Sequence, residues 1–257
     1  MNYLDVVILG IVEGFTEFLP ISSTAHLIIT SALLEIPSSA FLSSFIIAIQ
    51  LGAIASVVAV YWRTIVFDRE TMQRVAVAFI PTAIIGFVLY KTLKSYLIDN
   101  MLLIACALLV GGVILVVYEY MEKRESTAVI SDSPIPYGTA FIIGCAQALA
   151  IIPGVSRAGA TILSGLMLGI SRAQIVEFSF LLAIPTMITA TAYDLYKSGS
   201  SFAAGEWELL GVGFIVSAIA AYAAVRFLIK YISNHTFEAF GWYRIALGIV
   251  ILAYLTL

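Results

Sequence analysis

Long runs of apolar residues, separated by short polar stretches, extend over the whole chain. Eight such segments stand out, and six of them are close to the length of about twenty residues that one helical span of a bilayer requires. The eight segments cover residues 4–34, 40–62, 75–93, 101–120, 137–170, 176–196, 207–231 and 239–257. Because lipid offers the backbone no hydrogen-bond partners, we expect these segments to be helices, which satisfy their own polar groups.

Two segments, 4–34 and 137–170, are longer than the others and are interrupted by proline and polar side chains. Proline removes a backbone donor and disfavours helical backbone in the residue before it. We therefore expect two half-helices in each segment, around a break at Pro20 in the first and at Pro153-Gly154 in the second. Half-helices of about fifteen residues are too short to cross a bilayer separately, so each segment is predicted to be a re-entrant hairpin that enters and leaves on one side.

The two halves of the chain match in order, because a broken segment is followed by three spans in each. Gly10-x-x-Glu13 aligns with Gly144-x-x-Gln147, and Pro20–Ser23 aligns with Pro153–Ser156 after a slip of one residue. Three is an odd number of crossings, so the second half must begin on the opposite side of the membrane, as in an inverted-topology repeat. The predicted fold is an all-α polytopic membrane protein with six transmembrane helices plus two re-entrant helical hairpins. It forms a single membrane domain, 1–257, with inverted repeats at 1–120 and 137–257.

Composition supports this fold class and excludes others. Hydrophobic residues make up 61% of the chain and charged residues 11%, whereas a soluble domain has about half and a quarter. The net charge of -3 gives no basic face for nucleic acid, so no nucleic-acid partner is expected. The N-terminus lacks a basic region and a small-residue cleavage site, so we expect no removable signal peptide.

Lysine and arginine residues indicate the orientation, since cytoplasmic loops carry an excess of positive charge. If the loop at 62–74 is placed on one side, nine basic residues fall on that side and three on the other. The nine are Arg63, Arg69, Arg74, Lys123, Arg124, Arg172, Arg226, Lys230 and Arg244, and the three are Lys91, Lys94 and Lys197. We therefore predict an integral plasma-membrane protein with the first side in the cytoplasm, both termini outside and a site that opens toward the outer face.

Four ionisable residues, Glu13, Glu17, His26 and Arg157, lie in segments that otherwise have the composition of membrane interior. A charged side chain at a helix centre costs about 2.5–3.5 kcal/mol on insertion scales, so these groups oppose insertion unless they share a hydrated pocket. Glu13 and Glu17 are four residues apart and share one helical face, where they need a cation, a proton or an arginine. The alternative to a functional pocket is a buried structural ion pair.

Hydroxyl side chains follow the first break, at Ser22, Ser23 and Thr24, and are suited to cap the next helix. His26 comes three residues after Ser23, on the same helical face. A hydroxyl beside an imidazole is a nucleophile–base pair, so we expect Ser23 and His26 to be catalytic. Direct attack by His26 is an alternative that the sequence leaves open.

The second break, with the sequence Pro153-Gly154-Val155-Ser156-Arg157, has the features of an anion site. The half-helix that follows presents free N–H groups and the positive end of its dipole. Gly154 permits close approach of the backbone, and Arg157 offers a planar fork of donors suited to phosphate oxygens. The spacing differs from that of a P-loop, so no nucleotide is predicted.

Together these groups suit phosphoryl transfer, which needs something to neutralise phosphates, something to attack and something to handle protons. Apolar surroundings point to a phosphate carried by a lipid. Glu13 and Glu17 could hold a Mg²⁺ or Ca²⁺ ion against a diphosphate, or could handle protons instead, and the sequence does not decide between these roles.

At these residues the chain closely resembles the undecaprenyl-diphosphatase family, membrane phosphatases linked to bacitracin resistance. The resemblance covers nearly the whole chain and is carried by VEGFTEFLPISSTAH at 12–26, PGVSRAGAT at 153–161 and FSFLLAIP at 178–185. It implies hydrolysis of undecaprenyl diphosphate to the monophosphate and inorganic phosphate, which recycles the lipid carrier for cell-wall peptidoglycan and other envelope glycans. It also implies a divalent cation and a similar fold, with six spans, two re-entrant pairs and inverted repeats.

Carried over to this sequence, the resemblance implies functional roles for Glu13, Glu17, Ser23, His26, Ser156, Arg157 and Thr161. We extend the expected phosphate contacts to Ser22, Thr24, Gly154 and Gln147. Two positions depart from the family pattern, because Ala25 stands where the family usually has Gly and Ala158 where it usually has Ser. Both changes are small and bear on rate or lipid preference more than on reaction type.

A transporter or lipid flippase is the second function that the sequence allows, since inverted repeats with broken midplane helices are typical of transporters. The hydroxyl, imidazole and guanidinium groups favour hydrolysis, because transport needs no nucleophile. The expected partners are a polyprenyl diphosphate lipid and the membrane. A homodimer is a further assembly that the protein could form.

Overall fold

The computed structural model describes residues 1–96, 100–124, 133–198 and 202–256, and in these ranges the regular elements are all helical. The first half contains α1 (Tyr3–Thr16), α2 (Ser23–Leu33), α3 (Ala40–Phe67), α4 (Arg69–Tyr96) and α5 (Met101–Arg124). The second half contains α6 (Tyr137–Gln147), the short 3₁₀ helix η1 (Ala148–Ile151), α7 (Arg157–Met167), α8 (Arg172–Ser198), α9 (Ala204–Ile232) and α10 (Glu238–Thr256).

Six helices of the described chain are long and apolar enough to cross a membrane, and they are α3, α4, α5, α8, α9 and α10. This confirms the predicted helical class and the six candidate spans. Most of these helices extend beyond the apolar runs of the sequence, as α3 does by reaching Phe67, five residues after the predicted end at position 62. Helical backbone therefore continues past the apolar run into the polar flank.

Both predicted breaks are present. Helix α1 ends at Thr16 and α2 begins at Ser23, with Pro20 between them, while η1 ends at Ile151 and α7 begins at Arg157. The residue just before each second half-helix is a serine with a left-handed backbone, since φ is 72° at both Ser22 and Ser156. An L-residue rarely adopts this region without a local reason. The match pairs Ser22 with Ser156, which removes the one-residue slip in the sequence alignment.

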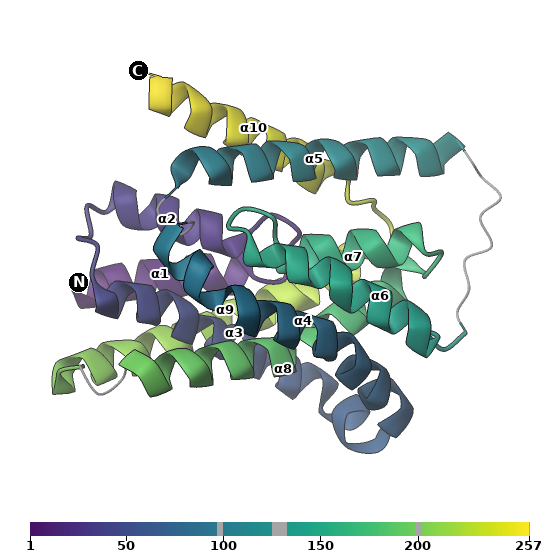
Figure 1. Cartoon of the computed structure of the whole chain (residues 1–257), viewed down its shortest axis with the longest axis horizontal. Coiled ribbons are helices and arrows are strands. Elements are labelled where there is room, and N and C mark those ends of the chain that lie inside the picture. Colours follow the sequence, from purple (N-terminus) through teal and green to yellow (C-terminus); the bar gives the residue numbers. More distant parts are fainter. Residues whose placement is uncertain (97–99, 125–132, 199–201, 257) are drawn as a thin grey trace.

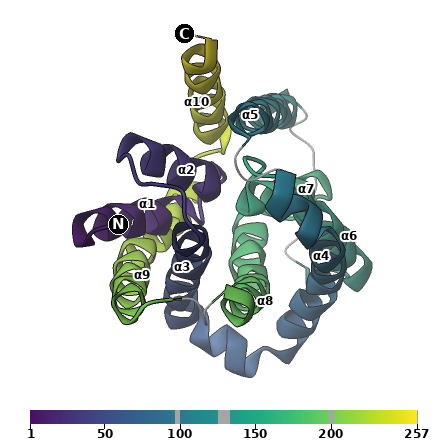
Figure 2. The same ribbon diagram turned by 60° about the vertical axis from the view of Figure 1, so that its left-hand side comes forward.

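Helices of the two halves pack against one another rather than forming separate bundles. Helix α1 lies along α9, α6 along α4, and α3 against both α8 and α9. Helices α5 and α10 lie side by side on the outside, with α2 and α7 beneath them (Figures 1 and 2). The glycine of each aligned motif makes a close approach possible, because a Cβ on Gly10 would lie 3.1 Å from the Gly213 carbonyl oxygen and one on Gly144 would overlap the carbonyl of Ala78.

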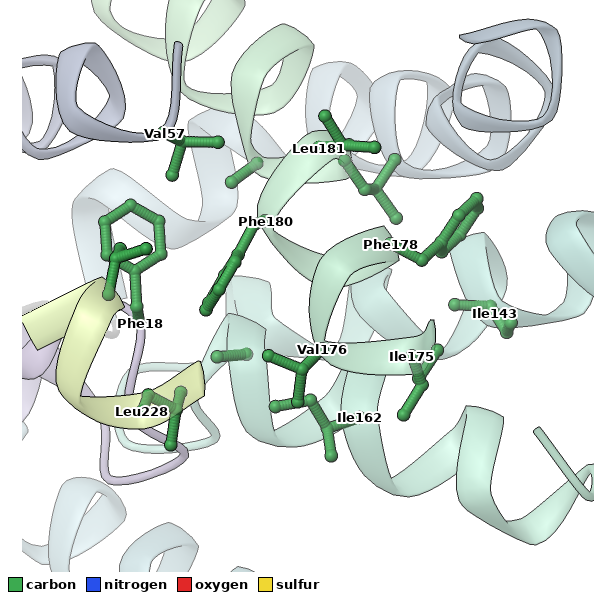
Figure 3. Packing of buried hydrophobic residues seen from close by; sticks show 14 of the residues in the cluster. Phe18, Val57, Ile143, Ile162, Ile175, Val176, Phe178, Phe180, Leu181 and Leu228 are labelled. Atoms are coloured by element: carbon green, nitrogen blue, oxygen red, sulfur yellow. The ribbon is translucent and has the colours of Figure 1, made fainter. Parts of the chain in front are cut away.

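The main hydrophobic core includes buried side chains of several helices and of the first break (Figure 3). Phe18, in the first break, meets Phe180 of α8 edge-on, with ring centroids 5.2 Å apart. Figure 3 shows these two rings between Val57 and Leu228. Because Glu17 and Ser179 are the chain neighbours of the two rings, the core fixes where their polar groups lie.

Candidate active site

A chain of three polar side chains connects the two breaks. The Ser23 hydroxyl donates to Oε2 of Glu17 over 2.5 Å, and Nη2 of Arg157 lies 2.9 Å from Oε1 of the same carboxylate. All three side chains are buried. Glu17 and Ser23 come from the first break and Arg157 from the second, so the ion pair joins the two halves of the protein.

Arg157 has a second anchor on α8. Its Nη1 donates to the Ser179 carbonyl oxygen over 2.9 Å, and its guanidinium lies 5.7 Å from the centre of the Phe18 ring. Consecutive residues thus have different partners. Phe18 and Phe180 pack in the core, while the Glu17 carboxylate and the Ser179 carbonyl oxygen bind the arginine. This arrangement holds the guanidinium fork in one place, as recognition of a phosphate requires.

These groups border a polar cavity of about 140 Å³. Its lining includes seven of the predicted site residues, namely Glu17, Ser22, Ser23, Thr24, Gly154, Ser156 and Arg157. The first residues of α2 and of α7 therefore meet at one cavity, where both helices present N-terminal backbone N–H groups. The Ser156 hydroxyl accepts from the Gly159 N–H, whereas Ser22 makes no such cap bond.

His26 lies elsewhere, and the structure does not bring it to the Ser23 hydroxyl as we predicted. Nδ1 of His26 lies 2.7 Å from the Ser22 carbonyl oxygen, and Nε2 lies 2.7 Å from the Tyr243 hydroxyl on α10. A carbonyl can only accept, so Nδ1 carries the proton and Nε2 of the neutral ring accepts from the tyrosine. The hydrogen-bond partner of Ser23 is Glu17, and His26 instead holds Ser22, whose backbone is left-handed.

Gln147 and Thr161 are also outside the polar cavity and bond to each other behind it. The Thr161 hydroxyl donates to Oε1 of Gln147 over 3.2 Å, and Nε2 of Gln147 donates to the hydroxyls of Thr82 and Thr186, each over 3.1 Å. The Gln147 amide is thus occupied by three threonines. In this geometry it supports α7, rather than offering a free donor to a phosphate.

Glu13 is fully buried on α1, and neither of its carboxyl oxygens has a hydrogen-bond partner among the described residues. It interacts electrostatically with Glu17 and Arg157. A buried carboxyl of this kind needs a proton or a cation. However, both oxygens of Glu17 are engaged, and the described residues contain no group of three His, Cys, Asp or Glu side chains that could hold a metal. A cation at this position would therefore need oxygen ligands beyond Glu13 and Glu17, and its binding there stays a prediction.

Sequence reasoning missed three residues near the site. Gln50, the one amide in the apolar stretch of α3, borders the polar cavity. Tyr243 of α10 contacts His26. Arg244 was counted with the cytoplasmic charges, yet its side chain is buried between the breaks, so the positive count falls from nine to eight against three. The only signals were single polar residues inside or beside apolar runs.

A second, apolar cavity of about 330 Å³ adjoins the polar one and shares four lining residues with it, Gln50, Ala150, Arg157 and Met187. Helices α4 and α8 form most of its walls, from Phe79 to Phe87 and from Thr186 to Tyr193. Its volume is within the range of small-molecule sites. An apolar group attached to an anion in the polar cavity would have room beside it.

Six helices long and apolar enough to cross a membrane indicate an integral membrane protein, and its two broken segments meet at a polar cavity lined by hydroxyl groups and an arginine. The chain belongs to the family described as bacitracin resistance protein BacA, whose model matches residues 6–250. Among its relatives is an undecaprenyl-diphosphatase of Sulfurihydrogenibium sp. (strain YO3AOP1), 50% identical over 250 residues, which cover 97% of this chain and 98% of the relative.

Two further relatives carry the same name. The protein of Aquifex aeolicus (strain VF5) is 48% identical over 255 residues, which cover 99% of both chains. That of Wolinella succinogenes is 47% identical over 257 residues and covers both chains completely. Because these relatives are named for hydrolysis, the comparisons do not favour the transporter alternative.

Proposed function

We propose that this protein is a membrane phosphatase that hydrolyses undecaprenyl diphosphate to the monophosphate and inorganic phosphate, and so recycles the lipid carrier for envelope glycan synthesis. The observation that carries the proposal is the chain Ser23–Glu17–Arg157, which puts a hydroxyl, its proton acceptor and a phosphate-binding guanidinium on one cavity. The names of the homologues over nearly the full length support the substrate.

In the proposed reaction, Ser23 Oγ attacks the terminal phosphorus while its proton passes to Glu17. The new O–P bond forms as the bond between phosphorus and the bridging oxygen breaks, and the lipid monophosphate leaves. Glu17 gives this proton to the departing lipid phosphate. Water then attacks the phosphoserine and gives a proton to Glu17, and the bond between Ser23 Oγ and phosphorus breaks as Oγ takes that proton back and phosphate leaves. The 2.5 Å hydrogen bond supports Glu17 as the base, because short O–H···O⁻ bonds are typical of a charged acceptor.

The remaining cavity residues would bind the phosphates. Arg157 offers its guanidinium, and the N-terminal turns of α2 and α7 offer backbone N–H groups. Ser22, Thr24, Gly154 and Ser156 line the same space. These donors stabilise charge that builds on the phosphate oxygens in the transition state. His26 would act indirectly, by holding the Ser22 carbonyl.

The isoprene units next to the diphosphate would occupy the apolar cavity between α4 and α8. The support is its continuity with the polar cavity through Arg157 and Met187. Exposed apolar side chains such as Phe87 lie on the same wall, so the rest of a long tail could extend into lipid without crossing polar surface.

The direct test uses the purified chain in detergent with a polyprenyl diphosphate. We expect phosphate release, its loss in Ser23→Ala, and a phosphoserine at position 23 in acid-quenched protein. Ser56→Ala is a matched control, because Ser56 is buried on α3 and its hydroxyl donates to the Ala53 carbonyl of the same helix. Detergent has no second compartment, so release there separates hydrolysis from transport. Full activity in Ser23→Ala would refute the proposed nucleophile.

We propose that the divalent cation, Mg²⁺ or Ca²⁺, is held mainly by diphosphate oxygens rather than by a preformed protein site. Glu13 and Glu17 remain the expected carboxylate contacts, but the second is already paired with Arg157. Calorimetry should detect cation binding in the presence of diphosphate and little without it. Tight binding of the cation to the free protein would contradict this arrangement.

The proposed membrane topology is an inverted repeat of two re-entrant hairpins and six spans. The same number of residues separates Gly10 from Gly144 and Ser22 from Ser156. Exchanging the halves converts the contact of α1 with α9 into that of α6 with α4, and returns α3–α8 and α5–α10 to themselves. Such exchange is expected of a two-fold relation between repeats. The 14 residues of α1 reach about 21 Å, short of the bilayer core.

We propose that the site opens toward the outer face, with both termini outside, as the eight-to-three excess of positive charge indicates. Cysteine labelling from outside the cell should modify Ser38→Cys and leave Asp68→Cys unmodified, in a background without Cys106 and Cys145. Labelling of the second position alone would reverse the orientation. The homodimer stays a prediction, to be tested by sedimentation in detergent.

A further inference from the structure

Arg244 of α10 is the point where the two breaks are tied to the outer pair of helices. Its side chain is buried, and it makes four hydrogen bonds, all to backbone carbonyl oxygens. Nη1 donates to Pro20 and to Val155 over 3.1 Å, and Nη2 donates to Gly154 over 3.0 Å and to Ala107 over 3.1 Å. One side chain thus bonds the first break, the second break and α5.

The space for this guanidinium is made by glycines. A Cβ on Gly111 of α5 would overlap Nη2 of Arg244, and a Cβ on Gly159 of α7 would lie 3.0 Å from Nη1. The space that holds the arginine therefore depends on glycines in two different helices, α5 and α7. Such a fit fixes the guanidinium plane, and with it the carbonyls that the guanidinium binds.

Arg157 has a carboxylate partner for its positive charge, whereas Arg244 has neutral partners. Arg157 is paired with Glu17, so together they carry no net charge. No ion pair is formed by Arg244 with a carboxylate in the described ranges of the chain, and its four acceptors are neutral. Two of these acceptors belong to Gly154 and Val155, and Gly154 also lines the polar cavity.

We infer that Arg244 is a positioning residue for the proposed phosphatase reaction, which holds the two breaks at their working separation and supplies the uncompensated positive charge behind the diphosphate. It does not line the cavity, so it acts through the carbonyls of the breaks and through its field. A buried cation without a counterion is unfavourable by itself, and an anion bound in the cavity offsets that cost. The inference rests on the proposed function for its substrate, but its charge can be tested without turnover.

The test compares Arg244→Gln, which removes the charge, with Arg244→Lys, which keeps the charge and loses the planar fork. Binding of inorganic diphosphate to the full chain in detergent is measured by calorimetry, and kcat and KM are measured with the lipid diphosphate. For Arg244→Gln we expect Kd and KM to rise roughly tenfold or more, as for one charge removed from a partly screened site. For Arg244→Lys we expect Kd near the wild-type value and a lower kcat.

Arg172→Gln is the control, because Arg172 is a part-buried arginine paired with Glu119 and Glu122, and it lines neither the polar nor the apolar cavity. It should lower thermal stability and leave the Kd of diphosphate unchanged. An unchanged Kd in Arg244→Gln would overturn the inference, as would an equal loss of affinity in the control. If Arg244→Gln does not fold, Arg244→Lys decides, since weakened diphosphate binding with an unchanged kcat would contradict it. Wild-type protein that binds diphosphate but releases no phosphate would refute the proposed function and leave this test intact.

Discussion

Replacement of Gly86 by leucine is the sharpest test of the apolar cavity as the seat of the lipid tail. Gly86 lines that cavity on α4, and a Cβ built on it meets no atom within 4 Å. The substitution should therefore not disturb the packing of the empty protein. It also replaces the poorest helix former except proline, so the helix itself should gain up to about 1 kcal/mol.

The expected loss in kcat/KM depends on which interaction the tail loses when it can no longer enter the cavity. Outside the protein the tail lies in lipid or detergent, so leaving the cavity exposes no apolar surface to water and costs little transfer energy. Steric overlap with the new side chain is the larger effect, at about 1–3 kcal/mol for overpacking. That range corresponds to a loss of roughly 5- to 150-fold in kcat/KM for the lipid diphosphate.

The assay measures kcat/KM with a long-chain polyprenyl diphosphate and, separately, the Kd of inorganic diphosphate, which has no tail. Gly86→Leu should impair only the first. Gly211→Leu is the matched control, since Gly211 on α9 also has open space around its Cβ but lines neither cavity. Two results would refute the placement of the tail: a wild-type kcat/KM in Gly86→Leu, or a loss of affinity for inorganic diphosphate as large as the loss in kcat/KM.

Three further substitutions test the site and the packing around it. Glu17→Gln removes the proposed base, so phosphate release should fall about 100- to 10,000-fold, and activity within tenfold of wild type would contradict this role. Tyr243→Phe removes one hydrogen bond from His26, worth about 1 kcal/mol, and should lower kcat about fivefold, because the bond to the Ser22 carbonyl remains. An unchanged kcat in Tyr243→Phe would count against the proposed indirect role of His26. Gly144→Ala places a methyl group against the Ala78 carbonyl and should lower stability by about 1–3 kcal/mol, measured by thermal unfolding in detergent. A variant as stable as wild type would show that α6 can move away from α4.

The helices and the two breaks could be predicted from the sequence because their causes are local. Apolar length indicates a span, and proline indicates where a helix stops, so Pro20 and Pro153 located both breaks within a few residues. The alignment of the breaks needed backbone geometry, since the left-handed serines, Ser22 and Ser156, look like any other serine in the sequence.

The candidate site was found from charges in apolar segments, but its pairing was partly wrong. Helical spacing suggested that Ser23 faces His26. However, Ser23 is the first residue of α2, and side chains lean toward the N-terminus of a helix, which brings its hydroxyl to Glu17. His26 leans the same way, onto the Ser22 carbonyl, and then reaches α10. Arg157 lines the polar cavity, and its predicted binding of an anion stays a prediction.

Arg244 could not be predicted because its partners are long-range. It follows Trp242 and Tyr243 near the start of an apolar run, a context that is typical of a membrane interface. Three of its four acceptors are backbone carbonyls of the two breaks and the fourth is on α5, and the nearest of the four in the sequence is 89 residues away. The sequence around Arg244 therefore does not indicate that the residue is buried.

The bond between Arg244 and the Pro20 carbonyl spans 224 residues, which has a consequence for biosynthesis. Ribosomes make the chain from the N-terminus, so the first break leaves the ribosome long before α10 does. The proposed nucleophile, its proposed base and Arg157 all precede the helix that ties the breaks together, so they are inserted while that helix is still being made. Insertion of the last helix is therefore the step that completes the site, and a chain cut short before α10 would be inserted, helical and inactive.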